Sequence, residues 1–234
     1  ENLEELDLSS NALTILPEEL FSLANIENLY LNNCKLKELP PAIANMKKLV
    51  GLRVMKNMLK AFPKEFYELE SLRKLAASDN EISVLSPNII RLKSLEILRL
   101  NSNNLKQLPK EIGNLSNLKY LDLSDNLLTS IPEEITKLSS KDFGFHIEGN
   151  YNLQVPPLGV CQCGLESVFA FYESKRADDS NCIHSKRLKV VLLGESGAGK
   201  SSLAYALEHG RAPNILPDDH TVGIEFFSWK PNPE

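Results

Sequence analysis

A period of 23 residues constrains the fold of this chain more than any other feature of its sequence. Leucine or isoleucine stands at the start of six successive units, at positions 3, 26, 49, 72, 95 and 118. Each unit follows the pattern L-x-x-L-x-L-x-x-N-x-L-x-x-L-P-x-x-I-x-x-L, which the first unit fills from Leu3 to Leu23. A unit this short cannot bury its own apolar side chains, so the units are expected to stack into a solenoid.

Each position of the unit has an expected place in that solenoid. The L-x-L segment alternates with a period of two, which predicts a short strand with one buried face and, after stacking, a parallel sheet. Asparagine follows the strand, where its amide can bond backbone groups of adjacent turns; it stands at 11, 57, 80, 103 and 126. Cys34 takes this place in the second unit and is interpreted as structural. Proline then begins a return that predicts a short helical or irregular convex side. These roles absorb most of the 40 leucines of the chain and five of its 21 asparagines.

The array is predicted to close at its C-terminal end. Phe145, Ile147 and Asn150 indicate an irregular seventh strand and turn. Apolar residues at 165, 168, 169 and 172 follow a helical spacing and predict a helix that covers the last layer. We therefore place the array and its cap at residues 1–173. Residues 174–187 are polar, charged and aperiodic, which predicts a linker.

The outward side chains of the strands are expected to form one continuous concave surface. Tyrosine, methionine and arginine are enriched in protein interfaces, and the outward positions include such residues together with an isoleucine. The surface is therefore predicted to bind a protein partner or another domain of the same protein, and the alternative is a solvated sheet with incidental aromatic side chains. The candidate partner-binding residues are Tyr30, Arg53, Met55, Ile97, Arg99 and Tyr120.

A second motif follows the predicted linker. Residues 188–193 form an apolar run typical of a buried parallel strand, and residues 194–201 fit G-x-x-x-x-G-K-[ST] before a helical stretch. Backbone amides of such a loop surround nucleotide phosphates, Lys200 is expected to neutralise the β- and γ-phosphates, and Ser201 to bind Mg²⁺. The candidate nucleotide-binding residues of the loop are Gly194, Glu195, Ser196, Gly197, Ala198, Gly199, Lys200, Ser201 and Ser202.

These motifs resemble known families. The repeat pattern resembles the short intracellular class of leucine-rich repeats. His220-Thr221-Val222-Gly223 is similar to the first switch of Ras-like GTPases, which implies that Thr221 contacts Mg²⁺ and the γ-phosphate. The order of repeats, cap, linker and Ras-like segment resembles the Roco family. The resemblance implies an α/β chain in which a leucine-rich-repeat solenoid is followed, over residues 188–234, by the N-terminal part of a Ras-like P-loop GTPase fold. It also implies GTP or GDP with Mg²⁺ as cofactors and a molecular switch as the function.

Two motifs expected from the resemblance do not occur in this sequence, and several alternatives stay open. No D-x-x-G second switch and no N-K-x-D base-reading motif occur before Glu234, so guanine specificity rests on the resemblance. We expect a fragment truncated within the GTPase domain, with no catalytic residue of its own. The parent protein is expected to continue into a dimerisation domain, which would make it a homodimer, and in some members into a kinase. The alternatives are a scaffold whose nucleotide domain only binds and a parent serine/threonine protein kinase.

Composition limits the expected partners and location of the protein. The net charge of −5 does not favour a nucleic-acid partner, and no apolar run is long enough to predict a membrane span. The four cysteines Cys34, Cys161, Cys163 and Cys182 lack zinc-type spacing and are too few for a disulfide framework. A reduced, cytoplasmic location is therefore expected.

Overall fold

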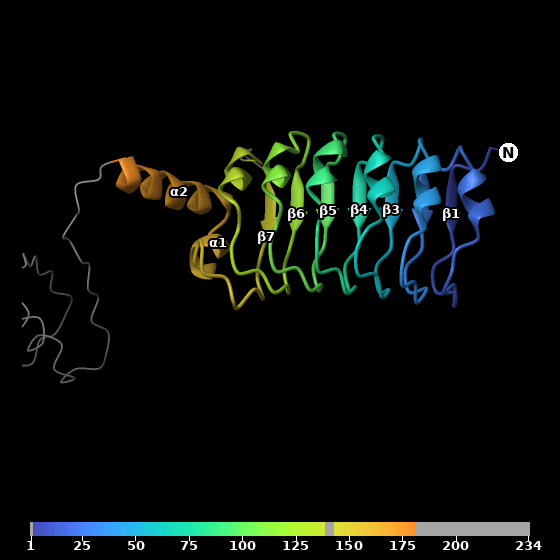
Figure 1. Ribbon diagram of the computed structural model, residues 1–234, viewed down its shortest axis with the longest axis horizontal. Coiled ribbons are helices and arrows are strands. Elements are labelled where there is room, and N and C mark those ends of the chain that lie inside the picture. Colours follow the sequence, from blue (N-terminus) through green and yellow to red (C-terminus); the bar gives the residue numbers. More distant parts are fainter. Residues whose placement is uncertain (1, 139–142, 181–234) are drawn as a thin grey trace, which may run out of the picture. The chain divides into compact units, whose positions relative to one another are not determined.

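The computed structural model describes residues 2–138 and 143–180, and within them the predicted solenoid is present (Figure 1). The predicted nucleotide-binding residues 194–202 and Thr221 lie outside the described residues. The strands of the described part form one seven-stranded parallel sheet in chain order. These strands are β1 (Glu5–Asp7), β2 (Asn28–Tyr30), β3 (Gly51–Arg53), β4 (Lys74–Ala76), β5 (Ile97–Arg99), β6 (Tyr120–Asp122) and β7 (Gly144–His146).

The pairing register of the sheet follows the sequence period. From β1 to β6 each residue pairs with the residue 23 positions later, as Glu5 does with Asn28 and Ile97 with Tyr120. The step from β6 to β7 is 24 residues, so Tyr120 pairs with Gly144. The central leucine is fully buried in β2 through β6. The same position of every repeat therefore lies in one column across the sheet, and the neighbours of the central leucine in each strand face outward.

The convex side consists of short 3-10 helices, as expected. A proline precedes the helix in five of the six repeats, as Pro40 does in extended conformation before η2. Residues such as Ile43, Phe66 and Ile112 are fully buried beneath the helices. The helices are η1 (Glu18–Ser22), η2 (Pro41–Asn45), η3 (Lys64–Glu68), η4 (Pro87–Arg91), η5 (Lys110–Asn114) and η6 (Glu133–Leu138).

The fourth repeat shows why one position departs from proline. Ser86 stands where the other repeats have proline, and its backbone N–H donates to the hydroxyl of Tyr67 at 3.3 Å. Its own hydroxyl accepts from the N–H of Asn88 at 3.2 Å and caps η4. Proline has no N–H to donate, so a proline at this position could not form the hydrogen bond to the buried tyrosine of the preceding repeat.

The asparagine column forms a buried ladder that joins consecutive repeats. The side chain of Asn103 accepts from the N–H of Ile82 at 2.9 Å and donates to the carbonyls of Ala77 and Leu100, both at 3.0 Å. The carbonyl of Ala77 also accepts from Asn80, and that of Leu100 also accepts from Asn126. Each of these carbonyls is therefore shared by two successive asparagines, and the ladder is continuous.

Cys34 occupies the ladder position of the second repeat, as interpreted from the sequence. Its side chain is fully buried, and its thiol donates to the carbonyl of Leu8 at 3.2 Å. Asn57 of the next repeat supplies the acceptor for the N–H of Cys34, at 3.0 Å. The residue is therefore structural in the described array.

The array ends in two helices beside β7 (Figure 1), α1 (Leu158–Gln162) and α2 (Leu165–Ser180). Val168 of α2 is fully buried, and the hydroxyl of Tyr172 donates to the carbonyl of Ile131. Arg176 forms an ion pair with Glu133 and another, within α2, with Glu173. The contacts of Tyr172 with Ile131 and of Arg176 with Glu133 attach the predicted cap helix to the sixth repeat.

Helix α2 continues beyond the end expected from the sequence. The sequence predicts an aperiodic linker from residue 174 onward, but the helix runs to Ser180. The apolar spacing that predicts the helix stops at Tyr172. The residues that follow include no glycine or proline, so nothing in their type ends the helix there.

Among residues 2–138 and 143–180, none of the helices has the length and apolar character of a membrane-spanning helix.

Candidate functional site

The outward columns of the sheet bring the predicted partner-binding residues together on one face. Three columns of outward side chains cross the sheet: the first holds the first residue of each strand, the middle the last residue of each strand, and the third the residue two positions after it. Arg53 and Arg99 share the middle column, at equivalent positions of β3 and β5. Ile97 and Tyr120 are paired neighbours in the first column, while Tyr30 lies beside Arg53. The arginines are exposed, and the tyrosines, Ile97 and Met55 are half-buried. All six predicted residues therefore belong to the same surface, hereafter the concave face.

Two arginine–tyrosine stacks organise this face. The guanidinium carbon of Arg53 lies 5.1 Å from the ring centroid of Tyr30, and that of Arg99 lies 5.1 Å from the ring centroid of Tyr120. Such cation–π contacts hold a guanidinium against the ring and reduce the freedom of both side chains. Tyr120 also lies 5.2 Å from the ring of His146, measured between centroids. The face therefore presents ordered aromatic and cationic groups.

The ionisation of Tyr30 suits a role as a neutral contact. Partial burial and the nearby Glu5 carboxylate raise the pKa of Tyr30 above its ordinary value of 10.0. The phenol is protonated at neutral pH, as it would be at its ordinary pKa, and its hydroxyl is hydrogen-bonded to Glu5.

Polar side chains of the third outward column form hydrogen bonds within the protein. The side chain of Asn32 accepts from the N–H of Met55 at 3.0 Å, and the hydroxyl of Ser78 donates to Asn101. The hydroxyl of Ser124 donates to Asp122 at 2.6 Å. These polar groups stabilise the turns that follow the strands, so the cationic hydrogen-bond donors of the face are Arg53, Lys74 and Arg99.

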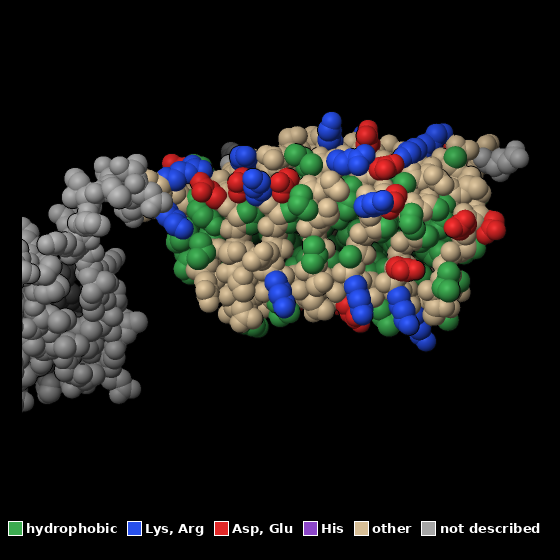
Figure 2. Space-filling model, in the orientation of Figure 1, with side chains coloured by type: hydrophobic (Ala, Val, Ile, Leu, Met, Phe, Trp, Pro, Cys, Tyr) green, Lys and Arg blue, Asp and Glu red, His purple; other side chains and the backbone are tan. Residues whose placement is uncertain are grey.

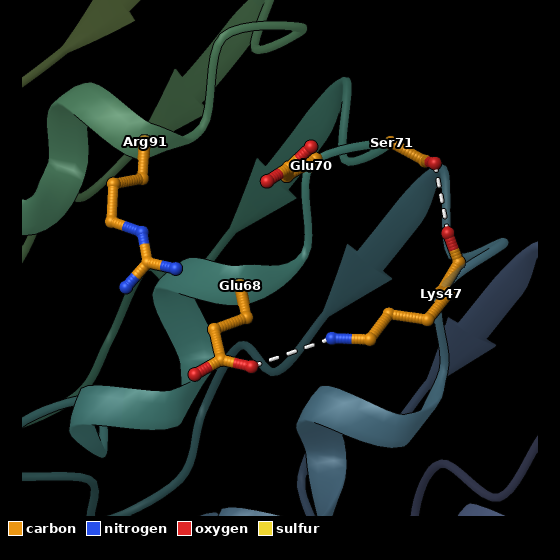
Figure 3. A pocket seen from close by; sticks show the side chains of 5 residues that line it. All are labelled: Lys47, Glu68, Glu70, Ser71 and Arg91. Carbon is orange, nitrogen blue, oxygen red and sulfur yellow. Dashed lines mark hydrogen bonds and ion pairs between the residues drawn. The ribbon is translucent and has the colours of Figure 1, made fainter.

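A second surface feature is a hollow of about 340 Å³ on another side of the repeats, lined by Lys47, Glu68, Glu70, Ser71 and Arg91 (Figure 3). Lys47 and Glu68 approach to 3.4 Å, with side chains 61% and 41% exposed, so water screens this ion pair. The hydroxyl of Ser71 donates to the carbonyl of Lys47 at 2.8 Å. In the view of Figure 2, basic side chains lie among acidic ones along the upper border of the array. The hollow is lined by residues of both charge signs and by no apolar residue, so it is a poorer candidate site than the concave face.

The described residues offer no metal centre. Among residues 2–138 and 143–180, no group of three or more His, Cys, Asp or Glu side chains is placed to hold a metal ion. Burial raises the pKa of the Cys161 thiol to about 11, which disfavours the thiolate that metal binding requires. The expected Mg²⁺ ligands Ser201 and Thr221 lie outside this part of the chain.

Sequence reasoning missed the outward residues of the last strand. His146 of β7 extends the middle column beyond Asp122, and its partly exposed ring lies beside Tyr120. The signal was present in Phe145 and Ile147, which alternate as in the other strands. The 24-residue step hides it, because the columns expected from the sequence cover only the regular 23-residue units.

Comparisons with known proteins agree with the repeats. Sequence models of the leucine rich repeat match residues 93–140 in one case and residues 2–23 and 25–46 in another. The disease resistance protein RPP5 of Arabidopsis thaliana is 51% identical over 55 residues, which is 23% of this chain and 4% of that protein. The chain therefore spans a small part of this curated relative.

Solved structures support the same architecture. The LRR protein LIC12759 of Leptospira interrogans is 38% identical, with a TM-score of 0.51 over 60% of this chain and 33% of its own. The structure of PEPR1-AtPEP1 is 22% identical, with a TM-score of 0.52 over 58% of this chain and 20% of its own, and shows the fold alone. The chain thus carries a leucine-rich-repeat solenoid with a parallel sheet, an architecture of protein–protein interaction. The Ras-like domain and the Roco family stay predictions.

Proposed function

We propose that the repeat array binds a protein partner through its concave face. The observation that carries this proposal is the pair of arginine–tyrosine stacks, Arg53 on Tyr30 and Arg99 on Tyr120. Tyrosine and arginine are the side chains that most often dominate binding energy, and they act at the centre of an interface. Met55 and Ile97 add half-buried apolar area on the same face.

Peptide display on the whole chain tests this proposal while the natural partner is still unidentified. Random 12-residue peptides that bind the chain are selected, and their affinities are measured by isothermal titration calorimetry. We expect Tyr30→Ala/Tyr120→Ala to weaken the selected peptides ~30-fold, because each tyrosine contributes contact area to the centre of the face. Tyr151, which is 88% exposed in the turn after β7, provides the matched control Tyr151→Ala, which should leave affinity unchanged.

The proposal fails if Tyr30→Ala/Tyr120→Ala and Tyr151→Ala weaken binding of the selected peptides equally, or if neither variant weakens it. A thermal melt of each variant checks that the array is intact.

We further propose that residues 188–234 bind GTP or GDP with Mg²⁺ and act as a switch. The loop from Gly194 to Ser201 supports this proposal through its motif and its position between a predicted strand and a predicted helix. Lys200 would contact the β- and γ-phosphates, while Ser201 and Thr221 would bind Mg²⁺. The resemblance to the Roco family, with its cytoplasmic and dimeric members, adds support for guanine as the base.

Two alternative functions are compatible with the same phosphate-loop motif. In one, the protein is an interaction scaffold whose nucleotide domain binds nucleotide without hydrolysis. In the other, the parent protein also carries a protein kinase. Titration of the full-length protein with GTP and ATP separates all of these nucleotide-binding proteins from a scaffold that binds no nucleotide.

A further inference from the structure

The three central strands of the concave face carry an unbalanced charge. In and just after β3, β4 and β5, the outward columns hold three cations and no acidic residue: Gly51, Arg53, Met55, Lys74, Ala76, Ser78, Ile97, Arg99 and Asn101. Acidic side chains stand on either side of this zone, as Glu5 and Asp7 of β1 and Asp122 of β6. The face is therefore positive in its centre and negative toward both ends.

The two central guanidiniums have no intramolecular anion. Two other arginines of the described part are ion-paired, Arg73 with Glu96 at 3.5 Å and Arg176 with Glu133. Within residues 2–138 and 143–180 the guanidinium groups of Arg53 and Arg99 make neither an ion pair nor a hydrogen bond, and each is instead stacked on a tyrosine ring. Stacking leaves the N–H groups at the edge of the guanidinium plane free, and these groups fit a carboxylate in the two-pronged geometry that arginine favours.

The spacing of the arginines fits an extended peptide. Ala76 of β4 separates them in the middle column, so their backbones lie two strand spacings apart, about 10 Å. An extended peptide that crosses the strands places same-side residues about 7 Å apart at i and i+2, and about 13 Å at i and i+4. Acidic residues at alternate positions therefore bring carboxylates within reach of both flexible arginine side chains.

We propose that the partner segment is an extended peptide with a short acidic centre, with one carboxylate bound by Arg53 and another by Arg99. This inference rests on the proposed protein-binding role of the concave face and adds the chemistry of the partner. Glu5, Asp7 and Asp122 repel a long uniform polyanion such as RNA, whereas they tolerate a peptide with neutral or basic ends. The charge pattern of the face therefore selects a short acidic stretch with basic flanks.

The nonapeptide KSESESESK, labelled with fluorescein, tests the inference by fluorescence anisotropy with the whole chain. We expect it to bind at least tenfold more tightly than KSQSQSQSK, in which glutamine replaces each glutamate. Arg53→Gln/Arg99→Gln should weaken it ~30-fold, because two charge-assisted contacts are lost. Lys60→Gln/Lys106→Gln removes the same charge from exposed residues outside the outward columns and should change affinity less than about twofold.

Three results would overturn the inference: equal affinity for the two peptides, equal weakening by the arginine and lysine double variants, or tighter binding of oligouridylate than of KSESESESK. Peptide display separates this inference from the proposed function. If the selected peptides depend on Tyr30 and Tyr120 but lack acidic residues, the concave face binds proteins and the acidic-centre inference is wrong.

Discussion

Asn103→Ala is expected to lower the free energy of unfolding by about 3 kcal/mol. The substitution leaves the buried N–H of Ile82 without its acceptor, the side chain of Asn103 at 2.9 Å. The carbonyls of Ala77 and Leu100 keep their second asparagine donors, so the orphaned N–H accounts for most of the cost. Urea unfolding followed by circular dichroism measures the change.

The adjacent residue supplies a matched control for this experiment. Asn104 is exposed, and Asn104→Ala should change stability by less than about 0.5 kcal/mol. Hydrogen exchange adds a local reading, since the amide of Ile82 should exchange faster in the Asn103 variant. If the two alanine variants were equally stable, the ladder would not be what joins the repeats.

Lys200→Ala is expected to weaken nucleotide binding by the full-length protein about 100-fold, a loss of about 2.7 kcal/mol. The proposed role of Lys200 is to neutralise the β- and γ-phosphates, and no other lysine of the loop can replace it. Titration with fluorescent GTP and ATP analogues in the presence of Mg²⁺ measures both the affinity and the base preference.

Lys186→Ala provides the charge-matched control, because Lys186 lies in the predicted linker before the loop. It should bind nucleotide as the wild type does. Absence of binding by the wild type to either nucleotide would favour a scaffold that binds no nucleotide. Equal affinities of wild type and the Lys200 variant would remove the phosphate loop as the binding site.

The array was predictable from the sequence because each structural role recurs with the period. The outward columns follow from counting 23 residues, and the register of the sheet confirms them from Glu5 through Asp122. The asparagine ladder follows from the side-chain amide, which both donates and accepts. Cys34 also fits, because a small buried donor fills the same place.

Other features depend on contacts that the period does not encode. The N–H of Ser86 donates to Tyr67, which lies 19 residues earlier in a different repeat. The stacking of Arg99 on Tyr120 depends on side-chain rotamers, which residue type alone does not determine. The extension of α2 to Ser180 lacks an apolar stripe to predict it. The roles of Lys200, Ser201 and Thr221 stay predictions from motif and resemblance.

Hydroxyl-radical footprinting of the chain with a peptide selected by display tests the concave face most directly. Tyr30, Met55 and Tyr120 are oxidisable side chains on this face, whereas Tyr151 and Phe169 lie outside its outward columns and are 88% and 45% exposed. We predict that bound peptide slows oxidation of the first three residues several-fold and leaves the other two unchanged. Unchanged oxidation of Tyr30, Met55 and Tyr120 under saturating peptide would contradict binding at the concave face.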